Sequence, residues 1–186
     1  MYKDKTLAQY LDDLAKKSPA PGGGSASAMA GALGAGLLSM VINFTLGKPK
    51  YAQYESEMSA FLKDSERIRM EFLKLVDEDV EAYLSKDIER SLAVPLSICR
   101  LCDEISSMCP VLCKHANINL ISDVAVAIDL LYAAFQGAYW NVDINLKVLN
   151  DQARAKDLRQ ELDGYSARIN AIRNETEVLV GKAIRG

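Results

Sequence analysis

The chain has no stretch in which apolar and polar residues alternate with the period of two that is typical of β-strands. It also has no internal repeat, no low-complexity tract and no long linker. Proline and glycine stand at the boundaries of stretches with helical periodicity, where they end helices. These absences predict an all-α fold, a multihelical array that forms a single domain over residues 1–186. We expect six helices, at about residues 5–17, 25–46, 51–86, 88–113, 120–149 and 152–184.

The chain has no excess of basic residues. Its formal net charge is -3 and its pI is about 5.3, which argues against nucleic acid or an anionic membrane as the main partner. The N-terminus also lacks a charged segment followed by an apolar one, because residues 1–17 have the pattern of a short amphipathic helix. We therefore expect a cytoplasmic protein with no nucleic-acid partner and no membrane partner.

Side chains that bind metals are few and clustered. The four cysteines are Cys99, Cys102, Cys109 and Cys113. Together with His115, the only histidine, they permit a zinc site of the pattern CxxC…CxxxCxH. One continuous helix would spread the thiols over roughly 21 Å, too far for a single ion, unless Pro110 folds the segment back. The pattern therefore favours buried thiols, with His115 a polar residue at the helix end rather than a catalyst.

Charge is missing altogether from one long stretch. No charged residue lies between Lys17 and Lys48, although the whole chain is 25% charged. The prolines and glycines of residues 19–24 cannot propagate a helix and predict a tight turn, after which Ser25 is a plausible N-cap. The following helix is diluted by three glycines, Gly31, Gly34 and Gly36. Each costs about 1 kcal/mol of helix propensity, which close approach of another helix would offset.

Two interpretations of this uncharged helix are open. About 20 uncharged residues flanked by lysines are long enough to span a bilayer. The Gly, Ala and Ser content, Asn43 and the amphipathic chain that follows favour a buried central helix instead. The glycine turn also presents free N–H groups at a helix N-terminus, which favours an anionic or polar ligand, although this signal is weak by itself.

Asp79 interrupts the apolar face of the helix expected over residues 51–86. That face carries Phe61, Ile68, Phe72, Val76 and Tyr83. With Phe72 at zero, Asp79 projects at about -20°, in the middle of the stripe. A carboxylate there must be paired or have a raised pKa, and a raised pKa suits general acid–base catalysis. The alternative is a structural partner such as a helix cap or an arginine pair. The neighbouring acids Asp77, Glu78 and Glu81 are predicted to face solvent.

The helix expected over residues 120–149 carries a second polar set. Asp123 and Asn141 project along one line, although Asp123 also suits a first-turn acid favoured by the helix dipole. Asp143 and Asn145 lie near the far end of the same helix. Such side chains could bind a polar heterocycle or make interhelical hydrogen bonds. Lys48 and Lys50, just past the uncharged helix, could clamp a carboxylated ligand or be a solvated helix end.

The last two helices differ in pattern. Residues 121–135 are apolar nearly all round, which predicts a place inside the bundle or at a subunit interface. The C-terminal helix has a narrower stripe with alternating steps of four and three, typical of a helix packed lengthwise on a partner. That stripe consists of Leu158, Leu162, Tyr165, Ile169, Ile172, Thr176, Leu179 and Ala183.

Five sequence blocks, in this order, resemble the cyclodeaminase/cyclohydrolase family. They are the glycine-turn opening (residues 18–51), LVDEDVEAY (75–83), AVPL (93–96), ISDVAVA (121–127) and GAYWNVDINL (137–146). The family includes the C-terminal domain of formiminotransferase-cyclodeaminase and methenyltetrahydrofolate cyclohydrolases. The resemblance implies an all-α homodimer, a folate substrate, and neither metal nor cofactor. The segment LSKDIERSL (84–92) is shorter than the connector often present in the family, which puts affinity or substrate identity in doubt.

The resemblance also implies site residues. Asp79 matches the acid taken as catalytic in the family, and Asp123 is a possible supporting acid. The predicted substrate-binding residues are Gly22, Gly23, Gly24, Ser25, Lys48, Lys50, Tyr83 and Asn141. The implied reaction is formimidoyltetrahydrofolate cyclodeamination, with methenyltetrahydrofolate cyclohydrolysis as the alternative. A folate-binding or scaffold dimer without catalysis is the alternative of another class.

Overall fold

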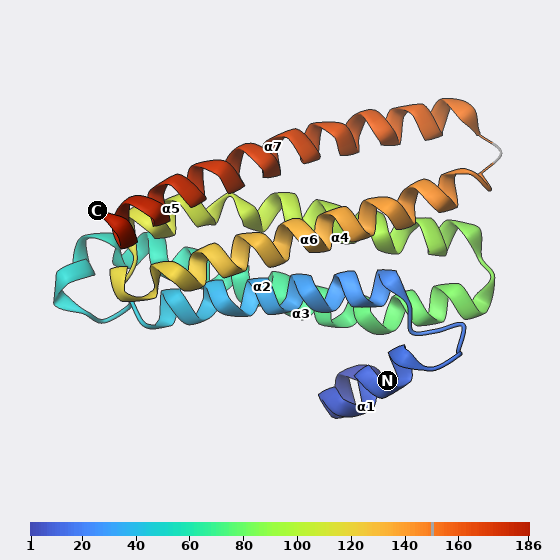
Figure 1. Ribbon diagram of the computed structural model, residues 1–186, viewed down its shortest axis with the longest axis horizontal. Helices are drawn as coiled ribbons and strands as arrows, with labels where there is room; N and C mark the ends of the chain where they lie inside the picture. Colours follow the sequence, from blue (N-terminus) through green and yellow to red (C-terminus); the bar gives the residue numbers. More distant parts are fainter. Residues whose placement is uncertain (150) are drawn as a thin grey trace.

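The computed structural model describes residues 1–149 and 151–186, and its secondary structure is helical throughout (Figure 1). This confirms the predicted all-α class. The α-helices are α1 (Leu7–Ala15), α2 (Gly23–Asn43), α3 (Glu55–Ser85), α4 (Ile88–Ser106), α5 (Met108–His115), α6 (Ile121–Leu146) and α7 (Gln152–Arg185). Short 3-10 helices are η1 (Tyr2–Asp4), η2 (Pro49–Tyr54) and η3 (Ile118–Leu120).

Helix α2 lies at the centre of the bundle, packed between α3 and α6 (Figure 1). Its glycines permit the close packing that the sequence predicted. A Cβ added at Gly31 would lie 2.6 Å from the Phe72 ring of α3, and one at Gly34 would lie 2.9 Å from Leu131 Cγ of α6. Gly36 has no such contact, since the nearest atom is Arg69 Cδ at 3.7 Å. Close approach therefore accounts for two of the three glycines.

Two helical segments are long and apolar enough to cross a membrane, residues 23–43 and 118–146. In the folded chain 56% of the apolar window of α2 and 39% of that of the second segment are buried. Core helices of a bundle have the same length and apolar composition, so these segments fit the buried helix that the sequence favoured for α2.

The helix expected over residues 88–113 is two helices, which is a correction. Helix α4 ends at Ser106 and α5 begins at Met108. Pro110 has no N–H to donate to the Ser106 carbonyl four residues earlier, and its ring crowds that carbonyl, so the helix breaks there. The Ser106 hydroxyl donates to the Asp103 carbonyl at 3.0 Å, and the Ser107 hydroxyl donates to the Glu104 carbonyl at 2.8 Å.

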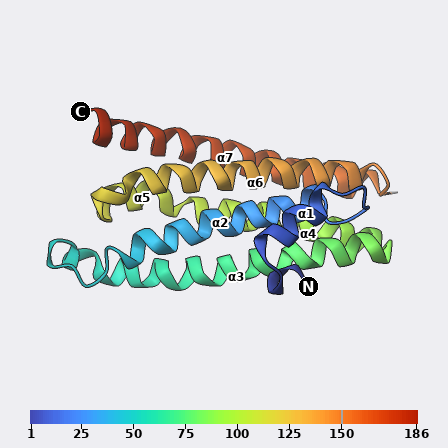
Figure 2. The ribbon, with the colours of Figure 1, turned by 60° about the horizontal axis from the view of Figure 1, so that its bottom comes forward.

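Helix α7 covers α4, α5 and α6 lengthwise (Figures 1 and 2). Leu162, Ile169 and Thr176 of its predicted stripe are fully buried, while Ala183 near the end is exposed. Arginines flanking the stripe pair with acids on the helices beneath, as Arg168 does with Asp103 at 2.8 Å and Arg173 with Asp129 at 2.7 Å. Exposed pairs of this kind set orientation more than stability, so the buried stripe is what attaches the helix.

Residues 1–20, which we call the N-terminal arm, lie beside the bundle against α3 (Figure 2). The arm consists of η1, α1 and the linker that leads into α2. Thr6 caps α1 in a capping box with Gln9, which fixes where that helix begins. The linker brings the arm back to the N-terminus of α2, next to the cavity described below.

Candidate active site

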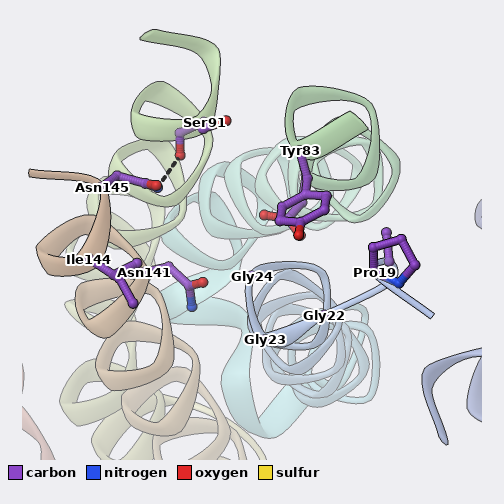
Figure 3. Close-up of a pocket in the computed structure, with 11 residues that line it drawn as sticks. Pro19, Gly22, Gly23, Gly24, Tyr83, Ser91, Asn141, Ile144 and Asn145 are labelled. Atoms are coloured by element: carbon purple, nitrogen blue, oxygen red, sulfur yellow. Dashed lines mark hydrogen bonds between the residues drawn. The ribbon is translucent and has the colours of Figure 1, made fainter. Parts of the chain in front are cut away.

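A cavity of about 200 Å³ lies where the N-terminus of α2 meets the C-terminal ends of α3 and α6 and the start of α4 (Figure 3). The linker of the arm forms one wall. The residues around the cavity are Pro19, Ala20, Gly22, Gly23, Gly24, Asp79, Tyr83, Ser91, Asn141, Ile144 and Asn145. Antiparallel packing of α2 on both α3 and α6 brings these distant segments together.

Asp79 is the ionisable carboxyl in this cavity. Its side chain is half-buried, and its Oδ2 accepts a hydrogen bond of 2.8 Å from the Ser25 N–H in the first turn of α2. The carboxyl thus caps a neighbouring helix while it faces the cavity. The two roles weighed from the sequence, helix cap and chemically available acid, meet in one side chain.

Gly24 makes this position possible. A Cβ at residue 24 would lie 2.1 Å from Asp79 Oδ1 and 2.7 Å from Cγ, distances that real side chains do not adopt. The carboxyl therefore packs directly on the α2 backbone. The absence of a side chain at this position is a geometric requirement of the site.

Burial raises the pKa of Asp79 above its usual value, and the hydrogen bond from Ser25 N–H offsets part of that rise. In the described part of the chain no cation is paired with this carboxyl. The arginine partner considered from the sequence is therefore absent from the described residues. A carboxyl with a raised pKa accepts a proton more readily than an ordinary aspartate, which suits general acid–base catalysis.

Amide side chains form the wall opposite Asp79. Asn141 donates from Nδ2 to the Gly137 carbonyl at 2.8 Å, and Figure 3 shows its side chain turned toward the start of α2. Asn145 donates to the Ser91 carbonyl at 2.7 Å, which ties α6 to α4 (Figure 3). Gly23 approaches Asn141, since a Cβ there would lie 3.4 Å from Nδ2. The Asn141 carbonyl oxygen remains available as an acceptor for a polar heterocycle.

Several predicted site residues lie together around this cavity. Asp79, Tyr83 and Asn141 line it, as do Gly22, Gly23 and Gly24. The predicted turn is shorter than expected, because Gly22, not Ser25, is the N-cap of α2, and Gly23 and Gly24 belong to its first turn. Ser25 is fully buried and lies behind the cavity rather than in its wall. Helical phase suggested that Tyr83 joins the apolar core. It lies instead at the rim of the cavity, where its side chain is 58% exposed. It is placed to cover a ligand with its ring.

Other predicted site residues lie elsewhere in the same chain. Asp123 is in the first turn of α6. Eighteen residues separate it from Asn141, which corresponds to roughly 27 Å along the helix. Lys48 and Lys50 follow the C-terminal end of α2, on the order of 30 Å from Gly24. Both lysines are exposed, with Lys48 Nζ 6.0 Å from the Phe44 ring centroid and Lys50 Nζ 5.3 Å from that of Tyr51. One chain alone does not bring them to Asp79.

The prediction that Asp77 faces solvent is wrong. Asp77 is only 6% exposed, because the N-terminal arm covers it. Its carboxylate accepts hydrogen bonds from the backbone N–H groups of Tyr2 and of Lys3, the latter at 3.3 Å. Helical phase correctly predicted that Asp77 points away from the apolar face of α3. No sequence signal showed that a segment 75 residues earlier covers that face.

The four cysteines do not form a metal site among the described residues. Cys99, Cys102 and Cys109 are buried and Cys113 is half-buried. Burial raises the pKa of Cys99 to about 12 and that of Cys113 to about 11. The thiols are therefore packing groups, as the helical spacing favoured. His115 stacks on Tyr54 at the start of α3 and pairs with Glu57 at 2.7 Å, away from the cavity.

These thiols should be inert in the folded protein, because the thiolate is the reactive form and burial disfavours it. A thiol reagent at pH 8 is expected to leave Cys99, Cys102 and Cys109 unmodified until the protein is unfolded. Treatment with a chelator should change neither the melting temperature nor turnover. Rapid labelling of all four thiols, or a chelator-induced loss of stability, would show that the cluster has another role.

A partly desolvated carboxyl beside hydrogen-bonding amides in one cavity is an arrangement that suits proton transfer on a polar ligand. Residues 6–87 and 84–164 match the family model described as formiminotransferase-cyclodeaminase. The chain belongs to this formiminotransferase-cyclodeaminase family.

Three known proteins show how similar this chain is to other proteins in sequence and structure. The methenyltetrahydrofolate cyclohydrolase of Methylorubrum extorquens is 35% identical over 92% of this chain and 94% of its own. The formimidoyltransferase-cyclodeaminase of Rattus norvegicus is 29% identical over 86% of this chain, which spans only 34% of that longer protein. The crystal structure of formiminotetrahydrofolate cyclodeaminase from Thermotoga maritima superimposes with a TM-score of 0.93, at 28% identity, over 99% of this chain and 100% of that one. These relatives are enzymes, which argues against a scaffold without catalysis.

Proposed function

We propose that the protein acts on the one-carbon unit held between N5 and N10 of tetrahydrofolate, as a methenyltetrahydrofolate cyclohydrolase. The observation that carries the chemistry is Asp79, a half-buried carboxyl with a raised pKa at the edge of a cavity. The likeness to a cyclohydrolase over nearly the whole of both chains supports this choice of reaction.

In this reaction water adds to the methenyl carbon, and Asp79 accepts a proton from the attacking water. The C–N5 bond of the tetrahedral centre then breaks while the protonated carboxyl returns that proton to N5. The remaining hydroxyl proton goes to solvent as the formyl carbonyl forms, which leaves 10-formyltetrahydrofolate. The negative charge of Asp79 also stabilises the cationic amidinium of the substrate before attack. One carboxyl with a raised pKa serves each step.

Formimidoyltetrahydrofolate cyclodeamination is the second candidate, favoured by the likeness to the Thermotoga maritima cyclodeaminase. There N10 attacks the formimino carbon, and the tetrahedral centre expels ammonia to give 5,10-methenyltetrahydrofolate. Asp79 would move the proton from N10 to the departing nitrogen. Both reactions therefore place the same carboxyl against the same carbon.

Absorbance of the methenyl compound separates the two reactions. A cyclohydrolase consumes 5,10-methenyltetrahydrofolate and the absorbance falls, whereas a cyclodeaminase given 5-formiminotetrahydrofolate produces it and releases ammonia. We expect the first reaction to have the higher kcat/KM. Turnover of the formimino compound alone would assign the protein to the second reaction, and turnover of neither, despite binding, would contradict the proposal.

The cavity of about 200 Å³ is smaller than the 300–1,000 Å³ typical of sites for drug-sized ligands. It can enclose the reacting end of a folate but not its glutamate tail. The tail must extend over the surface, where a cation would bind its carboxylates. Lys48 and Lys50 are too distant within one chain to do so.

We propose that a second copy of the chain supplies these groups in a homodimer. The outward face of α2 carries apolar side chains, with Leu33 56% exposed, and Phe44 just past the helix is 54% exposed. A groove of about 500 Å³ runs along this face between α2, α3 and α6. Exposed apolar surface of this extent is typical of an interface. An antiparallel pair of α2 helices would bring the Lys48 end of one chain to the Asp79 end of the other.

Mixing two impaired variants tests this arrangement. Asp79→Asn and Lys48→Ala chains, each with low activity alone, should regain activity when unfolded and refolded together, because mixed dimers contain one intact site. A monomer in sedimentation, or mixtures with no more activity than their components, would contradict the shared site.

A further inference from the structure

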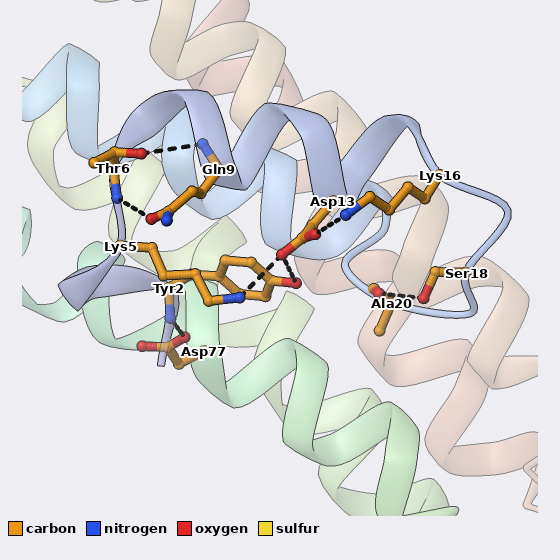
Figure 4. Close-up of polar contacts among 9 residues, drawn as sticks. All are labelled: Tyr2, Lys5, Thr6, Gln9, Asp13, Lys16, Ser18, Ala20 and Asp77. Atoms are coloured by element: carbon orange, nitrogen blue, oxygen red, sulfur yellow. Dashed lines mark hydrogen bonds and ion pairs between the residues drawn. The ribbon is translucent and has the colours of Figure 1, made fainter.

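The N-terminal arm is a folded unit organised around one acid. The Asp13 carboxylate accepts from the Lys5 ammonium at 2.9 Å, from the Lys16 ammonium at 2.7 Å and from the Tyr2 hydroxyl at 3.2 Å (Figure 4). The Lys16 and Lys5 ammonium groups lower the pKa of Asp13 to about 2. These contacts hold η1 and α1 together, so that the arm acts on the bundle as one piece.

The arm is attached to the bundle through a few specific contacts. Asp77 of α3 accepts the backbone N–H groups of Tyr2 and Lys3, and Figure 4 shows this carboxylate beneath the start of the chain. The Tyr2 ring packs edge-on against the Tyr10 ring, with centroids 5.2 Å apart. Within α1, which the structure describes completely, Tyr10 is the one buried residue, at 3% exposed.

The Tyr10 hydroxyl reaches the support of the catalytic carboxyl. It lies 3.2 Å from the Ser25 hydroxyl, which itself donates to the Val76 carbonyl at 2.9 Å. Because the one hydroxyl proton of Ser25 is used in that bond, Tyr10 is the donor and Ser25 Oγ the acceptor. The Ser25 N–H in turn donates to Asp79 Oδ2 at 2.8 Å. Ser25 is fully buried, so both of its polar groups depend on these partners.

We propose that Tyr10 is a positioning residue for Asp79, acting through Ser25, and that α1 thereby supports the active site. Ser25 holds α3 at two points one turn apart, the Val76 carbonyl and the Asp79 carboxylate. The Tyr10 hydroxyl fixes the orientation of the Ser25 hydroxyl and closes the space behind Asp79 to water. The expected effect of Tyr10 on turnover rests on the proposed function, whereas its expected effect on the Asp79 carboxyl does not.

Replacing Tyr10 by Phe removes this hydroxyl and keeps the ring that packs on Tyr2. We expect kcat to fall about two- to tenfold with little change in KM, the range that corresponds to one hydrogen bond. Water that enters the vacated space favours the ionised carboxylate, so the pKa of Asp79 should fall toward its ordinary value. Carbon-13 NMR of the labelled carboxyl measures that pKa without any assay of activity.

Tyr2→Phe is the matched control, since it removes a tyrosine hydroxyl from the same arm whose partner is Asp13 rather than Ser25. It should leave both kcat and the pKa of Asp79 unchanged. Ser25→Ala tests the route: the Tyr10→Phe change should have little further effect in that background, because its partner is gone.

Three outcomes would overturn the proposal: an unchanged pKa of Asp79 in Tyr10→Phe, an equal change in Tyr2→Phe, or additive effects of Tyr10→Phe and Ser25→Ala. A shifted pKa without any change in turnover would uphold the positioning role of Tyr10. That result would instead contradict the catalytic role proposed for Asp79, so failures of the two proposals are distinguishable.

Discussion

Replacing Asp79 by Asn is expected to lower turnover by about 100-fold or more, the range for loss of a general acid–base group. Asparagine has nearly the same shape, and its carbonyl oxygen can still accept the Ser25 N–H. It cannot take a proton from water or return one to N5. The loss should therefore appear mainly in kcat, with folate still bound and the fold retained. Steady-state kinetics and circular dichroism measure the two effects.

Glu78→Gln is the matched control, because it neutralises the adjacent acid of α3, which pairs with Lys74 at 3.0 Å rather than lining the cavity. Its turnover should equal that of the parent protein. Full activity in Asp79→Asn, or an equal loss in Glu78→Gln, would contradict the assignment.

The same Asp79→Asn variant should be at least as stable as the parent protein at pH 7. A carboxyl whose pKa is raised on folding stabilises the fold when protonated, below its unfolded pKa, and loses that contribution as the pH rises through its folded pKa. At pH 7 the ionised Asp79 is thus a net cost to folding that asparagine removes. A fall in the melting temperature would show that the carboxylate serves mainly as a structural cap.

Replacing Gly24 by Ala is expected to lower turnover by roughly tenfold or more and to reduce the free energy of unfolding by about 1–3 kcal/mol, as overpacking does. The new methyl carbon would lie 2.1 Å from Asp79 Oδ1, so the two atoms clash. The methyl carbon is fixed to the α2 backbone and cannot move aside. The Asp79 carboxyl therefore has to rotate away and lose its hydrogen bond from the Ser25 N–H. The change shows in kcat and in a denaturant titration.

Gly164→Ala provides the control for helix propensity. It lies within α7, where the nearest atom to a new Cβ is the flexible Arg168 guanidinium at 3.8 Å. Alanine there should stabilise the protein by up to about 1 kcal/mol without affecting turnover. If Gly24→Ala behaved in the same way, Asp79 could not lie where the structure places it.

The sequence was sufficient to predict most of the helices, the close packing around α2 and the unusual position of Asp79 on an apolar face. All of these depend on local periodicity, and Asp79 stands out because a carboxylate among apolar residues has few physical explanations. The glycine turn was predicted only in part, because Gly22 rather than Ser25 is the N-cap of α2, and Gly23 and Gly24 begin the helix.

The prediction of the second polar set considered direction around the helix and neglected position along its axis. Asp123 and Asn141 share one side of α6, but the eighteen residues that separate them correspond to about 27 Å along the axis. The burial of Asp77 and the contact between Tyr10 and Ser25 both depend on the N-terminal arm folding back on α3. Helical phase describes one helix at a time and contains no information about such a contact.

The most direct test of the account is the titration of the Asp79 carboxyl in the unliganded protein, followed by carbon-13 NMR and assigned by its disappearance in Asp79→Asn. The account predicts a pKa above the value of about 3.9 for an ordinary aspartate. A carboxyl that titrates at or below that value would be a hydrated or cation-paired group, and the proposed role of Asp79 in proton transfer would be wrong.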